Sequence, residues 1–329
     1  MNINRRAVVS ELECLVETKL SLLKPVENSW QPSDFVPQMD SEDWIADLKR
    51  FRQAAQEIPD ELLVVLVGTM VTEEALPSYQ AFLNRLDGVR DDTGTSKNPW
   101  AQWSRGWTAE ENRHGDLLNR YLYLTGRVDM RSVEVTIQHL IRNGFNPGEC
   151  NDTYNGLIYT AFQERATRIS HARIGQLARQ AGDESLAKIC NAIAGDEARH
   201  EEAYKSFVGR ICEIDPAGAV LAFNKMINQR IVMPAELMTD GSDNDLFAYF
   251  ANVAQRLGVY TFADYIDILD HLVGTWNVTK LGGLSGAAAA AQDRICRLPE
   301  IYRRRIGAIA KRLADQAKMH FMWIQNRPV

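Results

Sequence analysis

Cysteine is scarce in this chain and long apolar segments are missing, and each absence narrows the class of protein. Only five cysteines occur among the 329 residues, and no two of them form a Cys-x-x-Cys motif. A disulfide framework and a thiolate metal site are therefore not expected, and reduced thiols fit better. The longest apolar run, at 62–71, is about half of the ~20 residues that a membrane-spanning helix needs, so we expect no membrane insertion.

A signal peptide and an excess of positive charge are also lacking. The first 19 residues carry charges throughout and have no apolar central region. The formal net charge of −6 argues against nucleic acid as a partner. We therefore expect a protein of the bacterial cytoplasm, or of the plastid stroma if a transit peptide has been removed. A lipid substrate would have to be delivered by a soluble carrier.

Strand signals are nearly absent, whereas helical periodicity is widespread. No Pro- or Ser-rich linker divides the chain, so the sequence predicts one all-α domain over 1–329, with a bundle core at about 61–212 and further helices at about 215–329. A separate C-terminal subdomain from about 215 is the alternative. An alanine run at 287–291 is expected to be helical. The predicted helices span 10–24, 41–57, 61–86, 98–124, 130–143, 153–181, 184–212, 216–230, 244–257, 262–276 and 297–317.

Two of the six histidines follow a glutamate by three residues, within helices whose other residues form apolar stripes. These pairs are Glu111 with His114 and Glu197 with His200. Residues at i and i+3 project from one face of a helix, so each pair can present a carboxylate oxygen and an imidazole nitrogen to one point. Each pair taken alone is also compatible with a surface ion pair or a hydrogen-bonded core histidine.

Two further glutamates interrupt helices that are expected to be buried. Glu73 lies in the helix predicted at 61–86, which is apolar on nearly every side and so belongs at the centre of a bundle. Glu164 lies on the inner stripe of 153–181. A buried carboxylate is costly unless it is paired or bound to a metal. Arg165 or Arg168 could pair with Glu164, but no comparable cation lies near Glu73 in the sequence.

The order of these residues along the chain forms a pseudo-repeat. A lone glutamate is followed by a Glu-x-x-His pair 38 residues later in the first half and 33 residues later in the second. One glutamate from each of two helices and Glu-x-x-His from each of two others is the ligand set of ferritin-like di-iron bundles. Carboxylates with imidazoles suit iron or manganese better than zinc. The predicted ligands are Glu73, Glu111, His114, Glu164, Glu197 and His200.

At these residues the chain resembles the soluble acyl-[acyl carrier protein] desaturases of plastids and bacteria, over about 19–327. The motifs that carry the resemblance are Trp-Gln-Pro-x-Asp-Phe at 30–35, Thr-Glu-Glu-Ala-Leu-Pro at 72–77, Trp-Thr-Ala-Glu-Glu-Asn-Arg-His-Gly-Asp at 107–116, Phe-Gln-Glu-Arg-Ala-Thr at 162–167, Asp-Glu-x-Arg-His at 196–200 and Ala-Gln-Arg-Leu-Gly-Val-Tyr at 254–260. The resemblance implies a ferritin-like four-helix bundle with surrounding helices, usually a homodimer. It implies two iron ions held by the six residues above.

The resemblance also implies roles around the metal site. Trp30 and Asp196 match residues beside one ligand histidine that mark an electron route from ferredoxin. Thr167 matches a threonine beside the oxygen site that helps to deliver protons. The simpler alternatives are a core aromatic for Trp30, a surface acid for Asp196 and a hydrogen bond to a helix carbonyl for Thr167.

For the substrate, the resemblance implies a narrow apolar tunnel and a basic mouth for the acidic carrier protein. Phe82 stands where methionine is frequent and Arg85 where a small polar residue is frequent, so the tunnel could favour sixteen carbons over eighteen, or Phe82 could simply repack. Lys24 and Arg199 are the carrier contacts that the resemblance implies. The alternative for each is an ordinary solvated surface charge. Asn28 stands where a lysine is common in the family. The tunnel residues implied are Phe82, Leu83, Leu86, Gly156 and Leu157.

The implied reaction is the introduction of a cis double bond, at Δ9, into a saturated acyl chain on acyl carrier protein. An unactivated methylene has no acidic proton, so the reaction needs a cofactor, with O2 as co-substrate and two electrons from ferredoxin. The alternatives are a di-iron oxygenase acting on another substrate and a ferritin-like iron-binding protein.

Overall fold

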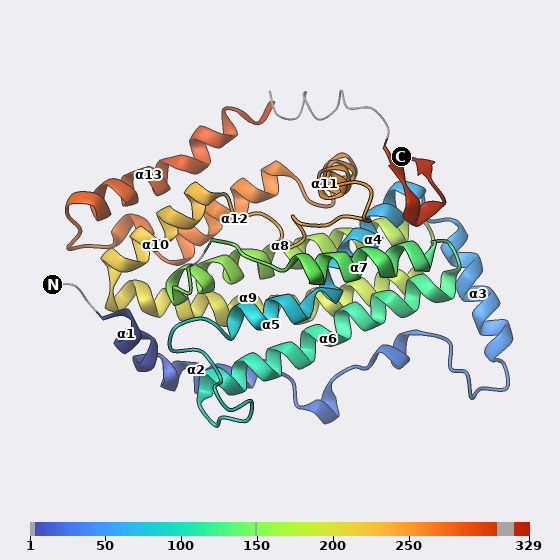
Figure 1. Ribbon diagram of the computed structural model, residues 1–329, viewed down its shortest axis with the longest axis horizontal. Coiled ribbons are helices and arrows are strands. Elements are labelled where there is room, and N and C mark those ends of the chain that lie inside the picture. The colour runs from blue at the N-terminus through green and yellow to red at the C-terminus, as the bar shows by residue number, and fades with distance from the viewer. Residues whose placement is uncertain (1–3, 149, 308–318) are drawn as a thin grey trace.

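Helices dominate the computed structural model of the chain, which describes residues 4–148, 150–307 and 319–329 (Figure 1). The α-helices are Arg5–Glu11 (α1), Glu13–Lys19 (α2), Trp44–Gln56 (α3), Asp60–Glu74 (α4), Leu76–Leu83 (α5), Pro99–Thr125 (α6), Met130–Asn143 (α7), Thr153–Gln180 (α8), Glu184–Ile214 (α9), Pro216–Gln229 (α10), Leu246–Leu257 (α11), Phe262–Thr275 (α12) and Gly286–Arg303 (α13). Short 3-10 helices span Leu20–Leu22, Val26–Asn28, Pro32–Phe35, Val278–Lys280 and Met322–Ile324. The prediction of an all-α fold is confirmed, whereas a single domain over 1–329 stays a prediction.

The long helices α6, α8 and α9 run side by side through the middle of the molecule, and α4 packs against α6 (Figure 1). Their ends carry the expected capping chemistry. Asn98, Asp152 and Asp183 each accept a backbone hydrogen bond at the start of α6, α8 and α9, and Gly126 ends α6 in the left-handed conformation. These four helices form the core of the bundle, which α10, α11, α12 and α13 flank on one side.

Helix α4 is buried on every side from Leu62 to Glu73, as its uninterrupted apolar sequence predicted. The predicted helix at 61–86 is nevertheless wrong in one respect, because the chain bends at Ala75 and continues as α5. Pro77 occupies the first turn of α5, where it cannot continue the hydrogen bonding of α4. Within the described residues no single helix combines the length and apolar character needed to cross a membrane; only the bent pair α4 and α5, 42° apart, meets those criteria jointly.

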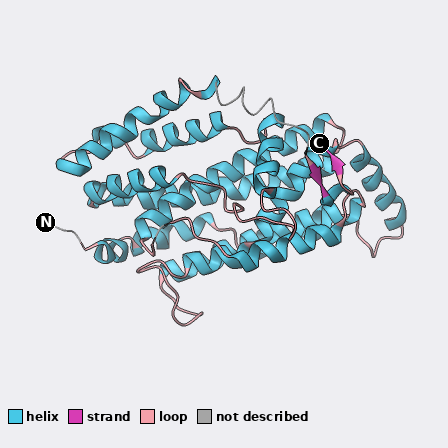
Figure 2. Ribbon diagram, turned by 45° about the horizontal axis from the view of Figure 1, so that its top comes forward, coloured by secondary structure: helices cyan, strands magenta, loops and turns pink. Residues whose placement is uncertain are grey.

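The two ends of the chain differ most from the predicted helices. The region 10–24 forms part of α1, then α2 and a 3-10 turn, in place of one helix. Helix α13 begins at Gly286 and takes in the alanine run; of the helix predicted at 297–317, the part at 308–317 lies outside the described residues. A hairpin of His320–Phe321 (β1) and Arg327–Pro328 (β2), the only strands described, was not predicted (Figure 2).

Candidate metal centre

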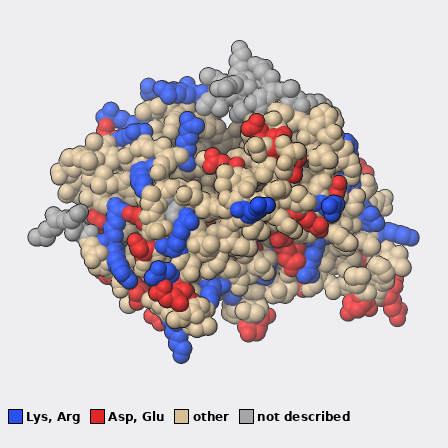
Figure 3. Space-filling model, in the orientation of Figure 1, with Lys and Arg blue, Asp and Glu red and all other residues tan. Residues whose placement is uncertain are grey.

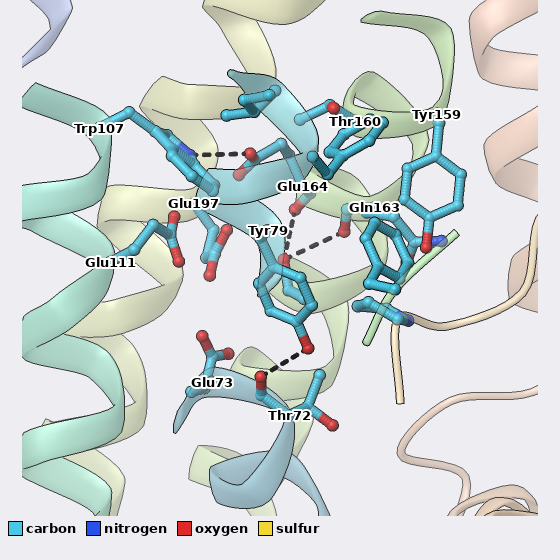
Figure 4. A pocket seen from close by; sticks show the side chains of 15 residues that line it. Thr72, Glu73, Tyr79, Trp107, Glu111, Tyr159, Thr160, Gln163, Glu164 and Glu197 are labelled. Atoms are coloured by element: carbon cyan, nitrogen blue, oxygen red, sulfur yellow. Dashed lines mark hydrogen bonds between the residues drawn. The ribbon is translucent and has the colours of Figure 1, made fainter. Parts of the chain in front are cut away.

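The four core helices bring together all six of the predicted metal ligands. Two groups form, and within each the ligand atoms lie within 4.8 Å of one another. Every member is buried, and the four glutamates face one another at one side of a cavity (Figure 4). The first group is Glu73, Glu111, His114 and Glu197, and the second is Glu111, Glu164, Glu197 and His200.

The atoms of these groups meet in a way that hydrogen bonding does not explain. Nδ1 of His114 lies 3.3 Å from Glu111 Oε2 and 3.4 Å from Glu197 Oε1, and Nδ1 of His200 lies 2.8 Å from Glu111 Oε1. Neither nitrogen, nor Glu111 Oε1, has a partner in hydrogen-bond geometry among the described residues. Buried polar atoms without partners are rare, so their convergence is what a cation-binding site requires. Oxygen and imidazole donors fit two divalent ions that share Glu111 and Glu197.

Charge within the cluster is poorly balanced in the protein alone. Burial raises the pKa of both Glu73 and Glu164, because an ionised carboxylate loses its hydration. Burial would also raise the pKa of Glu111, but His114 and His200 lower it to about 2. The cluster therefore retains protons that two divalent cations would displace, since metal ligands bind in their deprotonated forms.

The outer nitrogen of His114 faces an acidic side chain from the neighbouring helix. Asp196 Oδ2 lies 3.5 Å from His114 Nε2 and accepts a hydrogen bond of 3.0 Å from Arg113. The ring of Trp30 stacks on His114 at 6.0 Å, and the guanidinium of Arg113 lies 4.3 Å from the centre of the Trp30 ring. The structure thus brings Trp30 and Asp196 to the histidine where the sequence expected them. Such a carboxylate orients the imidazole toward a metal.

His200 has a matching set of neighbours, which the sequence analysis missed. Glu110 Oε2 lies 2.9 Å from His200 Nε2 and accepts a 2.6 Å hydrogen bond from Arg199. The signal was present in the sequence, because Glu110 precedes Glu111 as Asp196 precedes the second ligand pair.

The two expected carrier contacts lie at this same network. Arg199 donates to Glu110, to Asp196 and to the carbonyl of Leu22, and its side chain is 21% exposed. These bonds hold the guanidinium beside the metal ligands, and its role as a carrier contact stays a prediction. The ammonium of Lys24 lies 3.7 Å from Asp196, and its side chain is 40% exposed.

The lone glutamates of each half are also held by neighbours that the sequence did not reveal. Trp107 Nε1 donates to Glu164 Oε1 at 3.0 Å, and His171 Nε2 lies 2.9 Å from Glu73 Oε1. The alternative in which an arginine pairs with Glu164 is not what the structure shows. Arg165 and Arg168 instead contact the buried Glu201, at 2.7 and 3.0 Å.

A mostly apolar cavity opens directly onto the carboxylates (Figure 4). Part of its wall is aromatic, where Phe82 packs edge-on against Phe145 at 5.3 Å and Tyr159 at 6.1 Å. Of the five predicted tunnel residues, Phe82 and Leu83 line this cavity. The other three, Leu86, Gly156 and Leu157, are buried but are not among the lining residues.

A second cavity adjoins the first beside Glu73. The two share Thr72, Glu73 and Thr167, and the second extends between α4, α8 and α11. The hydroxyl of Thr167 donates to the carbonyls of Gln163 and Glu164 at 3.0 and 3.1 Å, as the simpler alternative expected. Thr167 nevertheless lines both cavities, so a role in proton delivery stays a prediction. Both cavities therefore reach the ligand Glu73, from different groups of lining residues.

Comparisons with known proteins agree with this geometry. A family model described as fatty acid desaturase matches residues 4–325. The chain is 56% identical to a chloroplastic stearoyl-[acyl-carrier-protein] 9-desaturase of Ricinus communis and 55% identical to a chloroplastic acyl-[acyl-carrier-protein] desaturase of Cucumis sativus, each match covering 95% of this chain and 79% of the relative. A solved structure of a putative acyl-ACP desaturase, DesA2, from Mycobacterium tuberculosis shares the fold with a TM-score of 0.55 and 20% identity, over 87% of this chain and 99% of that one.

Proposed function

The chain belongs to the fatty acid desaturase family, and we propose that it introduces a cis double bond into a saturated acyl chain carried on acyl carrier protein. The observation that carries this proposal is the apolar cavity that opens onto six buried metal-binding side chains. A saturated chain has no polar group to hold, so an enzyme can orient it only by the shape of such a cavity. The names of the relatives support Δ9 as the position of the double bond.

Two iron ions are the proposed cofactor, with O2 as co-substrate. Glu111 and Glu197 would be shared by both ions, because both residues belong to each ligand group. Glu73 with His114 would complete one metal position, and Glu164 with His200 would complete the other. When bound, the irons would activate O2 so that it can remove hydrogen from an unactivated methylene, which no side chain can do.

The protein's own contribution to the reaction is orientation and exclusion of water. The carboxylates of Glu110 and Asp196 hold the outer nitrogens of the two histidines, so that Nδ1 of each faces the ligand cluster. The acyl chain would lie against Phe82 and Leu83 with the bond to be oxidised beside the carboxylates. The apolar walls exclude water, which protects the oxidant from side reactions.

The bulky aromatic residues that line the cavity support a preference for chains of sixteen carbons over eighteen. Phe82, Phe145 and Tyr159 all line the cavity and pack against one another. The guanidinium of Arg85 lies 5.7 Å from the centre of the Phe82 ring and donates to the carbonyl of Phe145. This cluster would stop the methyl end of the substrate short of Leu86.

The proposed partners are acyl carrier protein, ferredoxin as the electron donor and a second copy of the chain. On the face in Figure 3, Lys and Arg side chains are spread over the half of the molecule that carries α10 and α13, with Asp and Glu side chains among them. The acidic carrier would bind at such basic side chains. Trp30 and Asp196 at His114 would form the electron route. The proposed compartment is the bacterial cytoplasm or the plastid stroma, the relatives being described as chloroplastic.

Single-turnover analysis tests this function directly. The iron-loaded protein is reduced without oxygen, then exposed to O2 together with palmitoyl or stearoyl carrier protein. The released acyl chain is analysed by mass spectrometry, and cleavage at the double bond locates it. We expect a product two hydrogens lighter, unsaturated at Δ9. An oxygenated product would indicate a different oxygenase, and an unchanged acyl chain would contradict the proposal.

A further inference from the structure

Each of the two lone glutamates of the metal cluster contacts a nitrogen donor through one carboxylate oxygen. Oε1 of Glu73 lies 2.9 Å from Nε2 of His171, and its Oε2 lies 3.9 Å from Nδ1 of His114. Oε1 of Glu164 accepts a 3.0 Å hydrogen bond from Trp107, and its Oε2 lies 3.6 Å from Nδ1 of His200. In each glutamate one oxygen is held from outside and the other faces a ligand histidine.

We infer that His171 is a positioning residue that fixes Glu73 and thereby sets how tightly one of the two metal positions, and not the other, is held. The inference rests on the proposed function, because it needs the metal cluster. Neither composition nor spacing pointed to His171, since its contact with Glu73 joins residues 98 positions apart on α4 and α8.

Among the described residues, the ring of His171 has no hydrogen-bond partner other than Glu73. The residue is fully buried, and its Nδ1 has no hydrogen-bond partner among the described residues. When Glu73 binds a metal it is ionised and its Oε1 can only accept, so Nε2 of His171 would carry the proton and donate it. A charge-assisted hydrogen bond of this kind is about twice as strong as a neutral one. His171 therefore acts on the metal position through one contact, which substitution can remove.

The contact of His171 with Glu73 and the contact of Trp107 with Glu164 act on different metal positions. Within the described chain, Glu73 belongs to the first ligand group alone and Glu164 to the second alone. Removing the donor to Glu73 should therefore loosen one ion of each chain, and removing the donor to Glu164 should loosen the other. A general loss of stability would instead affect both ions, since Glu111 and Glu197 are shared.

The experiment measures the release of ferrous iron from the loaded full-length protein into excess bipyridine without oxygen. For His171→Ala we expect two phases of equal size, one iron per chain leaving about 10–100 times faster than in the original protein and one leaving at the original rate. His171→Gln, which keeps an N–H donor, should restore most of the slow release. Mössbauer spectra should show one of two equal iron signals changed in His171→Ala, and the other signal changed in Trp107→Phe.

Each result has one meaning. If both irons of His171→Ala leave faster alike, or if neither rate changes, the inference is overturned. If His171→Ala does not fold, His171→Phe fills the same space without a donor and takes its place. A wild-type protein that holds no iron would contradict the proposed function itself, whereas two irons with unaltered release from the variant would overturn the role of His171 alone.

Discussion

Oε2 of Glu110 on α6 lies 2.9 Å from Nε2 of His200 on α9. The matching contact in the opposite direction is that of Oδ2 of Asp196 on α9, which lies 3.5 Å from Nε2 of His114 on α6. In each helix the acid comes immediately before a ligand glutamate, and it orients the histidine of the opposite helix. The two halves of the site are therefore interlocked, so that neither helix presents a correctly oriented histidine without the other.

Removing the charge at Glu110 should weaken metal binding without unfolding the protein. Glu110→Gln leaves a weaker acceptor for His200 Nε2, and changes of this kind typically cost about 10–100-fold in metal affinity or activity. Iron content after dialysis against a chelator measures the effect. Glu74→Gln is the matched control, because Glu74 also adjoins a ligand glutamate but accepts from Asn119 at 3.2 Å. Equal losses in the two variants, or none in Glu110→Gln, would contradict the role of Glu110.

Shortening an aromatic side chain in the wall of the cavity should lengthen the preferred substrate. In an apolar pocket each methylene is worth about 1–3 kcal/mol, so Phe82→Leu should raise the ratio of eighteen-carbon to sixteen-carbon turnover by roughly tenfold or more. Competition between the two acyl carrier proteins, followed by product analysis, measures that ratio. Phe223→Leu removes the same volume beside Trp276, outside the cavity, and should leave the ratio unchanged. An unchanged ratio in Phe82→Leu would show that Phe82 merely fills space.

The absence of a side chain at Gly156 should matter for stability, because Leu86 lies directly over it. A Cβ at 156 would approach Leu86 Cδ1 to 2.7 Å. Overpacking of this kind costs about 1–3 kcal/mol, so Gly156→Ala should lower the free energy of unfolding by that amount, measured in urea. Adding Leu86→Ala should cost less in this background than alone. Gly195→Ala, on α9 with no atom within 4 Å of its Cβ, should stabilise instead; equal effects at the two glycines would refute the close packing.

The free energy of unfolding should depend on pH through Asp264, which lies at the start of α12. Burial would raise the pKa of Asp264, but hydrogen bonds from Arg173 and Thr261 lower it below 3.8. The ionised form therefore stabilises the folded chain above about pH 4, and this contribution is lost as the pH falls through the lowered pKa. Asp264→Asn should reduce the free energy of unfolding near neutral pH by about 1.5–3 kcal/mol. Denaturant titrations between pH 3 and 7 should show this gap narrowing below pH 4.

A control on the same helix separates this effect from general surface charge. Asp267 is 70% exposed and pairs with Arg303 at 3.3 Å, so Asp267→Asn should change stability by less than about 1 kcal/mol. If Asp264→Asn lowers the free energy of unfolding by the same amount at pH 3 and at pH 7, the link between stability and the ionisation of Asp264 is contradicted.

The sequence was most informative where a local pattern dictates geometry. The Glu-x-x-His spacing placed His114 and His200 correctly, because three residues along a helix return to the same face. It was least informative where a contact is distant in sequence. The pairing of His171 with Glu73 leaves no local signature, and neither does the contact of Leu86 with Gly156.

The bend between α4 and α5 could have been predicted from a proline in the sequence, but the continuous apolar pattern favoured one long helix instead. Pro77 lies only three residues after Glu74, and a proline there ends the hydrogen bonding of α4. The alanine run was correctly expected to be helical, because alanine has high helix propensity, but the helix predicted from 297 begins earlier, at Gly286, and includes that run. The hairpin of β1 and β2 is too short for any alternating pattern to mark it.

The central claim, that six side chains hold two irons, is tested most directly by anomalous X-ray scattering at the iron edge from crystals of the iron-loaded protein. The account predicts two iron peaks in each chain, both within bonding distance of Glu111 and Glu197, one next to His114 and the other next to His200. A single peak, or iron bound elsewhere with these side chains turned away from it, would contradict the account.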